Sequence, residues 1–344
     1  MAKPVVLVLH PRTWAGKGFS QKHNCRFDYV HASIGGKVPR KRSGVPTYDG
    51  YADVVTEEGK QDMFNKVHAH KPVAFLYWMH AGLNPDALTK VRAVCPKIKF
   101  VHWYSNHRNT FPKGVDKMMP GRFIDLLLMN HDNPSQFKMF RNAGLKCGML
   151  WDGFDPAEVP LVPVKEEFDC FFGGNTYEVK AKKDGRFRFP AGNLRHKLIR
   201  AVAGRFKLLL HSSHAYAWQG LKTMPEVFHP QYTSAMRRAK ITLNVNHFPS
   251  FRHAYTRRTI RSIFAGRCHL TYYIPGMEDH FTNHKDIVWF KSIDEGLELI
   301  DHYLKHDAKR EMVAKNCLAN ALANHTWVTR VHQFEDHLQR ELGL

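Results

Sequence analysis

FDCFFGGNTY, residues 168–177, is the stretch that decides the fold of this 344-residue chain. Its first five residues form an apolar run that is typical of a buried β-strand, and Gly173, Gly174 and Asn175 follow closely. Because glycine has no Cβ, the backbone at such a turn can come close to a ligand. In an open α/β sheet, nucleotides bind at the carboxyl ends of strands. The stretch therefore predicts a ligand-binding strand end, with an ordinary tight turn as the alternative.

Short apolar runs alternate with helical patterns on both sides of this stretch. Near-continuous apolar character is typical of strands in a parallel sheet that is covered on both faces. Residues 33–50, with glycine, proline and basic residues, are expected to form an exposed loop. We expect strands at 4–10, 72–80, 98–104, 123–130, 147–152, 168–172, 206–211, 240–245, 268–273 and 286–290. We expect helices at 60–69, 85–94, 133–143, 193–203, 231–239, 257–265, 292–306, 307–323 and 327–342.

A segment with several prolines, residues 154–167, separates two such arrays. Two successive βαβ arrays favour an α/β protein with two Rossmann-like domains that face each other across a cleft, with C-terminal helices packing back. We expect an N-terminal domain at 1–155, a second domain at 156–325 and a C-terminal helix at 326–344.

The chain is strongly basic. It has 51 Lys and Arg against 31 Asp and Glu, a formal net charge of +20. A surplus of this size favours association with polyanions such as nucleic acid, anionic membranes or nucleotides. A general solubility charge is the alternative.

The six cysteines lie far apart along the chain, with no spacing typical of a metal site. Scattered single cysteines are typical of a reduced, intracellular protein. The start of the chain does not resemble a signal peptide, and no apolar run approaches the ~18 residues of a membrane span. We therefore expect a cytoplasmic protein without a bound metal. The sequence contains no Walker, HExxH or GxSxG motif, and no GxGxxG follows the first strand. This disfavours dehydrogenases, P-loop enzymes, metalloproteases and hydrolases.

A second informative stretch, FRHAYTRRTIRSIFAGR at 251–267, has five arginines and no acidic residue. Apolar residues three and four positions apart predict a short helix with one buried face, with Thr256 as its N-cap. Arg257, Arg258 and Arg261 then lie near the start of the helix. Arginine side chains carry fork-shaped donors that suit phosphate. The stretch therefore predicts a site for a small anionic ligand.

Three segments carry a resemblance to a known family: AMRRAKITLNVNHF (235–248), RRTIRSIFAGRCHLTYYIPGMEDHF (257–281) and DIVWFKSIDEGLELIDHYLKH (286–306). Together with FDCFFGGN they resemble the spore-maturation (CgeB-like) type of glycosyltransferase, which belongs to the two-domain GT-B superfamily. The resemblance covers roughly residues 70–330. It implies a nucleotide-sugar donor, with a UDP-sugar expected, that the second domain binds, an acceptor bound mainly by the first domain, and no required cofactor.

The resemblance also implies donor-binding residues. They are Gly173, Gly174, Asn175, Arg258, Arg261, Gly276 and Glu278. Two positions depart from the family: Arg261 stands where the family has a glutamate for the ribose, and His253 falls on an earlier acidic position. These departures leave the identity of the donor open.

Sugar transfer to a hydroxyl by inversion needs a base that takes the proton of the acceptor. Among histidines at expected strand ends, His80 follows a long apolar strand and precedes a glycine turn, so it ranks first. His253, near the donor motif, is a second candidate.

Donor binding accounts for a few arginines, and other basic segments lie outside the donor motifs. Positive charge in such segments suits contacts to a phosphate backbone. We therefore expect a glycosyltransferase that acts on DNA, on 5-hydroxymethylpyrimidines as bacteriophages make them, in the host cytoplasm. Alternatives are another acceptor (protein, surface glycan or metabolite) and a noncatalytic nucleic-acid-binding protein on a GT-B scaffold. The candidate DNA-binding residues are Lys37, Arg40, Lys41, Arg42, Lys182, Lys183, Arg186 and Arg188.

Overall fold

The computed structural model describes most of the chain. The described residues are 2–9, 19, 24–33, 35–39, 51–77, 83–104, 118–119, 122–158, 163–175, 190–213, 215–227 and 231–344. They form two compact units. Unit 1 takes in the described residues up to 153 together with 327–344, and unit 2 takes in residues 154–326.

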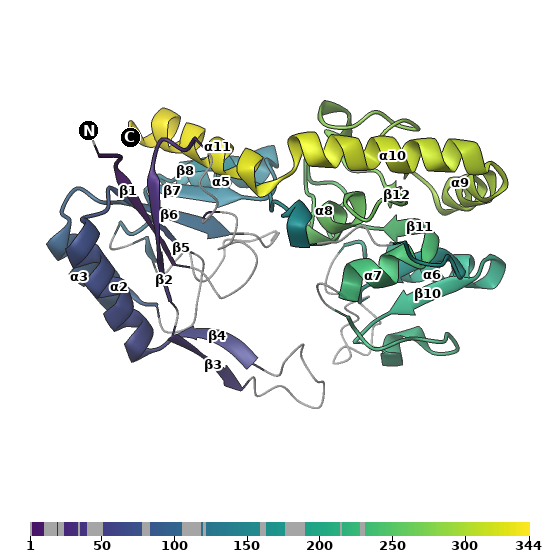
Figure 1. Ribbon diagram of the computed structural model, residues 1–344, viewed down its shortest axis with the longest axis horizontal. Helices are drawn as coiled ribbons and strands as arrows, with labels where there is room; N and C mark the ends of the chain where they lie inside the picture. Colours follow the sequence, from purple (N-terminus) through teal and green to yellow (C-terminus); the bar gives the residue numbers. More distant parts are fainter. Residues whose placement is uncertain are drawn as a thin grey trace. The chain divides into compact units, whose positions relative to one another are not determined.

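Unit 1 is built on a six-stranded parallel sheet with the order β2-β1-β5-β6-β7-β8 (Figure 1). Its side chains alternate between two cores, as the period of a strand requires. Leu7 and Leu9 of β1 pack in one core, and Val6 and Val8 pack in the other. The strands are β1 (Val5–Leu9), β2 (Asp28–Ala32), β5 (Ala74–Tyr77), β6 (Lys99–Tyr104), β7 (Leu126–Met129) and β8 (Lys146–Met149).

Helices cover both faces of this sheet. α2 (Glu57–His70), α3 (Pro85–Val94) and α5 (Pro134–Asn142) supply one core. α11 (Trp327–His337) supplies the other core through Trp327, Val331 and Phe334. The C-terminal helix expected at 326–344 therefore belongs to unit 1 from Trp327 onward.

Unit 2 has a second parallel sheet, with the order β10-β9-β11-β12-β13. Its strands are β9 (Phe168–Gly173), β10 (Leu208–His211), β11 (Ala239–Asn244), β12 (Cys268–Tyr272) and β13 (Val288–Phe290). One face packs against α6 (Gly192–Arg205), α9 (Ile293–Lys305) and α10 (Asp307–Asn324), and the other packs against α7 (Gln231–Arg237). α8 (Arg257–Ile263) follows β11 along the chain. The two parallel sheets with helices on both faces confirm the predicted α/β class.

Two local predictions were wrong. β2, with the sequence DYVHA, was not expected as a strand, because it lies at an edge of the sheet and is only partly buried. Residues 35–39, within the expected loop at 33–50, form β3 (Gly35–Pro39), which pairs antiparallel with β4 (Tyr51–Val55). In both cases strand pairing stabilises a segment that lacks the continuous apolar run of a central strand.

All six cysteines are buried. In the described part of the chain, no helix has both the length and the apolar character needed to cross a bilayer.

The buried His269 on β12 makes the stability of the protein depend on pH. The side chain is fully buried, shares a hydrogen bond of 2.9 Å with Thr242 Oγ1, and burial lowers its pKa to about 4. Below pH ~6.5 the unfolded chain binds a proton that the folded chain does not bind until about pH 4. This histidine therefore contributes a loss of about 2 kcal/mol in the free energy of unfolding between pH 7 and pH 5.

Urea unfolding of the wild type and of His269→Gln at pH 7 and pH 5 measures this contribution. We expect the variant to lose about 2 kcal/mol less than the wild type on acidification. The control His70→Gln, which alters an exposed histidine on α2, should lose as much stability as the wild type on acidification. An unchanged pH dependence in His269→Gln would contradict the assignment.

Candidate functional site

The strand order in the sheet of unit 2 reverses at β9. β10, the next strand along the chain, lies on one side of β9, and β11 lies on the other side. In open α/β sheets, ligands bind at the carboxyl ends of the strands where the order reverses in this way. The topology therefore indicates a candidate site where the ends of β9 and β10 approach α8.

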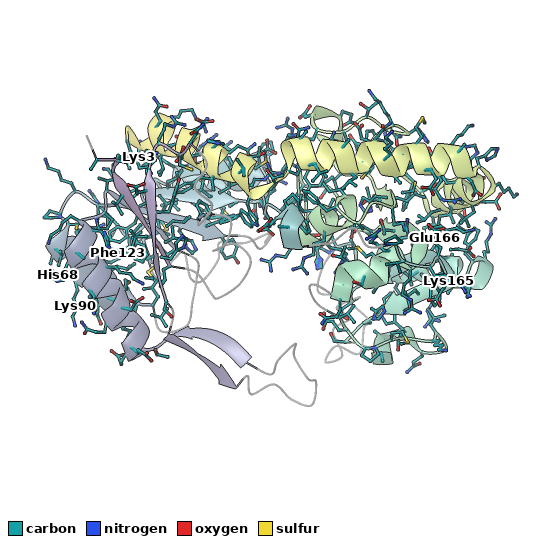
Figure 2. All side chains as sticks on the ribbon, viewed as in Figure 1. Lys3, His68, Lys90, Phe123, Lys165 and Glu166 are labelled. Carbon is teal, nitrogen blue, oxygen red and sulfur yellow. The ribbon has the colours of Figure 1, made fainter. Side chains whose placement is uncertain are left out.

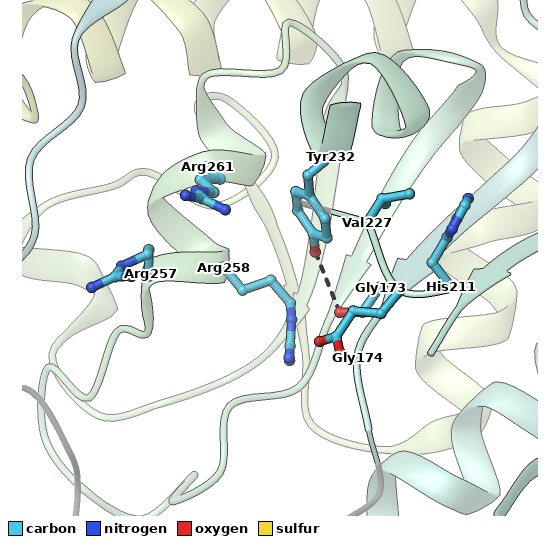
Figure 3. A pocket seen from close by; sticks show the side chains of 9 residues that line it. Gly173, Gly174, His211, Val227, Tyr232, Arg257, Arg258 and Arg261 are labelled. Atoms are coloured by element: carbon cyan, nitrogen blue, oxygen red, sulfur yellow. Dashed lines mark hydrogen bonds between the residues drawn. The ribbon is translucent and has the colours of Figure 1, made fainter. Parts of the chain in front are cut away.

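A pocket lies at this point (Figure 3). Its empty space, including the part open to solvent, measures about 510 Å³. Three arginines and one glutamate are the charged groups of the described lining, which makes the pocket strongly basic. The described lining residues are Gly173, Gly174, His211, Glu226, Val227, Tyr232, Arg257, Arg258 and Arg261.

A second pocket lies on unit 1 between α2 and α3, where His68 and Lys90 line it (Figure 2). Its described lining holds two lysines and a glutamate but no arginine. It therefore offers none of the forked donors that suit phosphate. The pocket of unit 2 is the better candidate for an anionic ligand.

The end of β9 requires glycine because two side chains occupy the space beside it. A Cβ on Gly173 would lie 2.6 Å from the ring of Tyr232, and a Cβ on Gly174 would lie 2.5 Å from Arg258 Nη2. The Tyr232 hydroxyl also donates a hydrogen bond of 3.3 Å to Gly173 O (Figure 3). The Gly174 N–H donates to His211 O at 2.9 Å and is therefore not free to bind a ligand. The glycines thus make room for Arg258 and Tyr232.

Arg258 is the central cation of the pocket. Its guanidinium carbon lies 5.6 Å from the centroid of the Phe172 ring, and its side chain reaches toward Gly174 (Figure 3). Its Nη1 is buried and has no hydrogen-bond partner among the described residues. A buried N–H without a partner costs free energy that an anionic ligand can recover. This geometry suits a bound phosphate.

Arg261 and Arg257 line the same pocket from α8. The Arg261 guanidinium carbon lies 6.0 Å from the Tyr232 ring centroid. Burial raises the pKa of the Tyr232 hydroxyl, while Arg258 and Arg261 oppose that shift through their charge. Thr256 holds the N-cap position of α8 as expected, but the predicted capping bond is absent. Its hydroxyl donates instead to Asn246 Oδ1 at 3.1 Å, because that amide oxygen lies within reach.

His211 lies at the end of β10, and its residue is 6% exposed. Its Nδ1 donates to Pro225 O at 2.6 Å, and burial lowers its pKa, so the neutral ring carries its proton on Nδ1. Nε2 is then a hydrogen-bond acceptor, and no described residue donates to it. Glu226, next to Pro225, brings a carboxylate to the same pocket.

A buried hydrogen-bond network fixes the turn after β9. The Asn175 side chain accepts from Ser212 Oγ at 2.6 Å and donates to Ser213 Oγ at 2.8 Å. Arg195, 2% exposed, donates to Asn175 O at 2.5 Å and to Val245 O at the end of β11. Asn175 was expected to contact the donor, but it does not line the described pocket. Its contacts give it a positioning role.

The structure gathers His253 and Gly276 at a different place in unit 2. His253 Nε2 lies 2.9 Å from Asp279 Oδ2, and a Cβ on Gly276 would lie 2.4 Å from the same nitrogen. Glu278 accepts a hydrogen bond of 3.3 Å from the Tyr273 hydroxyl. None of the three lines the described pocket that contains Arg258. Their predicted roles stay predictions.

Other predicted residues fall outside the described part of the chain. Lys37 lies on β3, but its side chain is not described. The residues outside the described ranges are His80, Arg40, Lys41, Arg42, Lys182, Lys183, Arg186 and Arg188.

Sequence reasoning missed His211, Glu226 and Tyr232. A signal existed for His211, because it directly follows the apolar run FKLLLH and so ends a predicted strand. Tyr232 was visible only as part of a predicted helix. Glu226 lies in a loop, where no periodic pattern indicates which way a side chain points.

Residues 194–336 match a protein family described as "Glycosyl transferase-like". This match contains α8 and most of unit 2. No curated protein sequence matches the chain.

Several solved structures have a similar fold. The chain is similar to Anabaena HepE in complex with UDP and glucose, with 12% identity, coverage of 98% of this chain and 99% of that chain, and a TM-score of 0.57. It is similar to a glycosyltransferase from Rickettsia africae, with 10% identity, 99% coverage of both chains and a TM-score of 0.60. It is also similar to sucrose-phosphate synthase from Thermosynechococcus elongatus, with 10% identity, 99% coverage of both chains and a TM-score of 0.55. The predicted GT-B fold is confirmed.

Replacing Gly174 by alanine tests how the pocket is built. The added Cβ would displace the Arg258 guanidinium, so we expect the affinity for inorganic pyrophosphate to fall about tenfold, equivalent to about 1.4 kcal/mol. Calorimetric titration measures the change. The control Gly220→Ala also places a methyl group on a glycine with positive φ, where no heavy atom lies within 4 Å, and it should bind like the wild type. Unchanged affinity in Gly174→Ala would contradict the role given to Arg258.

Proposed function

We propose that the protein is a glycosyltransferase that moves a sugar from a nucleoside diphosphate sugar to an acceptor hydroxyl. The observation that carries the proposal is the Arg258 guanidinium, held at the carboxyl end of β9 with a buried N–H that has no partner in the described part of the chain. It lies in a basic pocket at the point where the strand order reverses. The glycosyl transferase-like match over residues 194–336 supports the same reading.

In the proposed reaction, the bond between the sugar carbon C1 and the phosphate oxygen breaks, and the acceptor oxygen forms a new bond to C1. The acceptor hydroxyl loses its proton to a base, and the nucleoside diphosphate leaves with additional negative charge. Arg258 donates hydrogen bonds to that departing diphosphate, and Arg261 and Arg257 add positive charge beside it. Donors that are already oriented stabilise developing charge more than mobile water does. The arginines thus activate the leaving group.

UDP-sugars are the first donors to test, because HepE, which has a similar fold, has been solved in complex with UDP-glucose. His80 is our first candidate for the base, and His253 is the second. The bond between His253 and Asp279 would orient the ring.

For the acceptor we propose DNA that carries 5-hydroxymethylpyrimidines, as in bacteriophage DNA modification. The formal net charge of +20 supports this choice, because three pocket arginines account for little of it. The basic segments 37–42 and 180–207 are the proposed contacts to the phosphate backbone. Scattered, buried cysteines suit a reducing compartment, so we place the reaction in the cytoplasm.

Replacing Arg258 by glutamine tests the leaving-group role. We expect kcat/KM for sugar transfer to fall about 100-fold, the usual effect of removing one preorganised donor to developing charge. The control Arg205→Gln removes the same charge from an exposed position at the end of α6 and should retain activity. Equal activity of the two variants would count against the proposal.

A donor and acceptor screen tests the proposed substrates. UDP-, GDP- and dTDP-sugars are each combined with hydroxymethylated duplex DNA, and transfer of labelled sugar is measured against unmodified duplex. We expect transfer only to the hydroxymethylated duplex. Turnover without affinity for DNA would indicate another acceptor. Salt-sensitive DNA binding without turnover would indicate a noncatalytic DNA-binding protein.

A further inference from the structure

The pocket of unit 2 has two kinds of wall. Arg257, Arg258 and Arg261 come from α8, which follows β11 on one side of β9. His211 comes from the end of β10, on the other side of β9 (Figure 3). Glu226 belongs to the loop that follows β10. The first wall offers hydrogen-bond donors and positive charge, and the second offers acceptors.

The acceptor on His211 is unused by the residues that the structure describes. Nδ1 donates to Pro225 O at 2.6 Å, which fixes the orientation of the ring. Nε2 is buried, lies on a residue that lines the pocket, and has no hydrogen-bond partner within the described ranges. A buried acceptor without a partner is costly, so this nitrogen indicates a ligand that brings an N–H or O–H to it.

Glu226 is equally unengaged within the described part of the chain. No hydrogen bond or ion pair joins its carboxylate to another described residue, and it is the only acidic side chain of the described lining. The three arginines favour an anion in this pocket, whereas a carboxylate repels one. A ligand that suits both walls therefore carries negative charge at one end and neutral hydroxyl or amino hydrogens at the other.

We infer that Glu226 and His211 bind the nucleoside of the donor substrate, with Glu226 on the ribose diol and His211 Nε2 on an N–H of the base. The inference rests on the proposed function, since it assigns the second half of the same ligand. The two oxygens of a carboxylate match two vicinal hydroxyls, and an acidic residue holds the ribose in the same way in other doubly wound sheets. Uracil, guanine and adenine each offer an N–H, so His211 does not select among them. Glu226 makes the site selective for ribonucleotides over 2′-deoxyribonucleotides.

The test compares UDP with 2′-deoxy-UDP by calorimetric titration, and GDP and ADP with their 2′-deoxy forms in parallel. We expect the wild type to prefer the ribonucleotide about tenfold, as for one lost hydrogen bond to a charged group. Glu226→Gln should reduce this preference to about twofold or less, since the neutral amide makes only the weaker bond of an uncharged acceptor. The same variant should bind inorganic pyrophosphate as well as the wild type or more tightly, because a negative charge has been removed. These opposite effects would not arise from damage to the fold.

His211→Phe keeps a flat ring and removes the acceptor. It should weaken the binding of UDP about tenfold and leave the affinity for pyrophosphate unchanged. Glu298→Gln, which removes an exposed carboxylate from α9, is the control and should behave like the wild type throughout.

The outcomes separate the inference from the function on which it rests. The inference is overturned if Glu226→Gln keeps the full preference for UDP over 2′-deoxy-UDP, or if His211→Phe binds nucleotides as tightly as the wild type. In either case, nucleotide binding by the wild type leaves the proposed function intact. If the wild type binds pyrophosphate but none of UDP, GDP, ADP and dTDP, the proposed function fails, and the inference fails with it.

Discussion

The carboxyl end of β9 must accommodate two large side chains where a Cβ would otherwise lie, and the rest of the site depends on this constraint. Tyr232 packs against Gly173, and Arg258 packs against Gly174. A Cβ on either glycine would lie 2.6 Å or less from the neighbouring side chain. Tyr232 comes from α7 and Arg258 from α8, so the two glycines fix how these helices approach the sheet. The pocket is the space that remains beside these contacts.

The buried Arg195 holds this strand end in place through hydrogen bonds to the backbone. Its guanidinium donates to carbonyl oxygens that follow β9 and β11, the two strands between which the sheet changes direction. Loss of either bond would leave a buried carbonyl without that donor, and such a loss costs about 1–3 kcal/mol. The amide of Asn175 extends the network to Ser212, which in turn accepts from Trp218 Nε1 at 3.1 Å. Rigid support of this kind holds arginine donors at a fixed place before a ligand arrives.

The sequence predicted those parts of the fold in which one local pattern decides the structure. β9 was predicted because it is apolar on both faces, and α8 was predicted because its apolar residues recur at helical spacing. β2 was missed because an edge strand needs no continuous apolar run. Arg258 could be selected as a site residue because the helix pattern and the family resemblance agree at that position. Glu226 could not, since its place in the pocket depends on the path of a loop, and that path follows from tertiary contacts such as the bond between His211 and Pro225.

The charge at position 261 has a different meaning once Glu226 is considered. The resemblance implies a glutamate where this chain has Arg261. That departure alone suggests a pocket that no longer binds the nucleoside. In three dimensions the pocket still contains a carboxylate, which comes from the loop after β10. A cation on α8 with an anion on that loop gives the lining the same net charge as the reverse arrangement. A ligand responds to the field of the whole pocket. The position of the carboxylate does differ, because Glu226 lies on the side of β9 where His211 lies. Recognition of the nucleoside would then depend on β10 and its loop, and α8 would be left to bind phosphate alone.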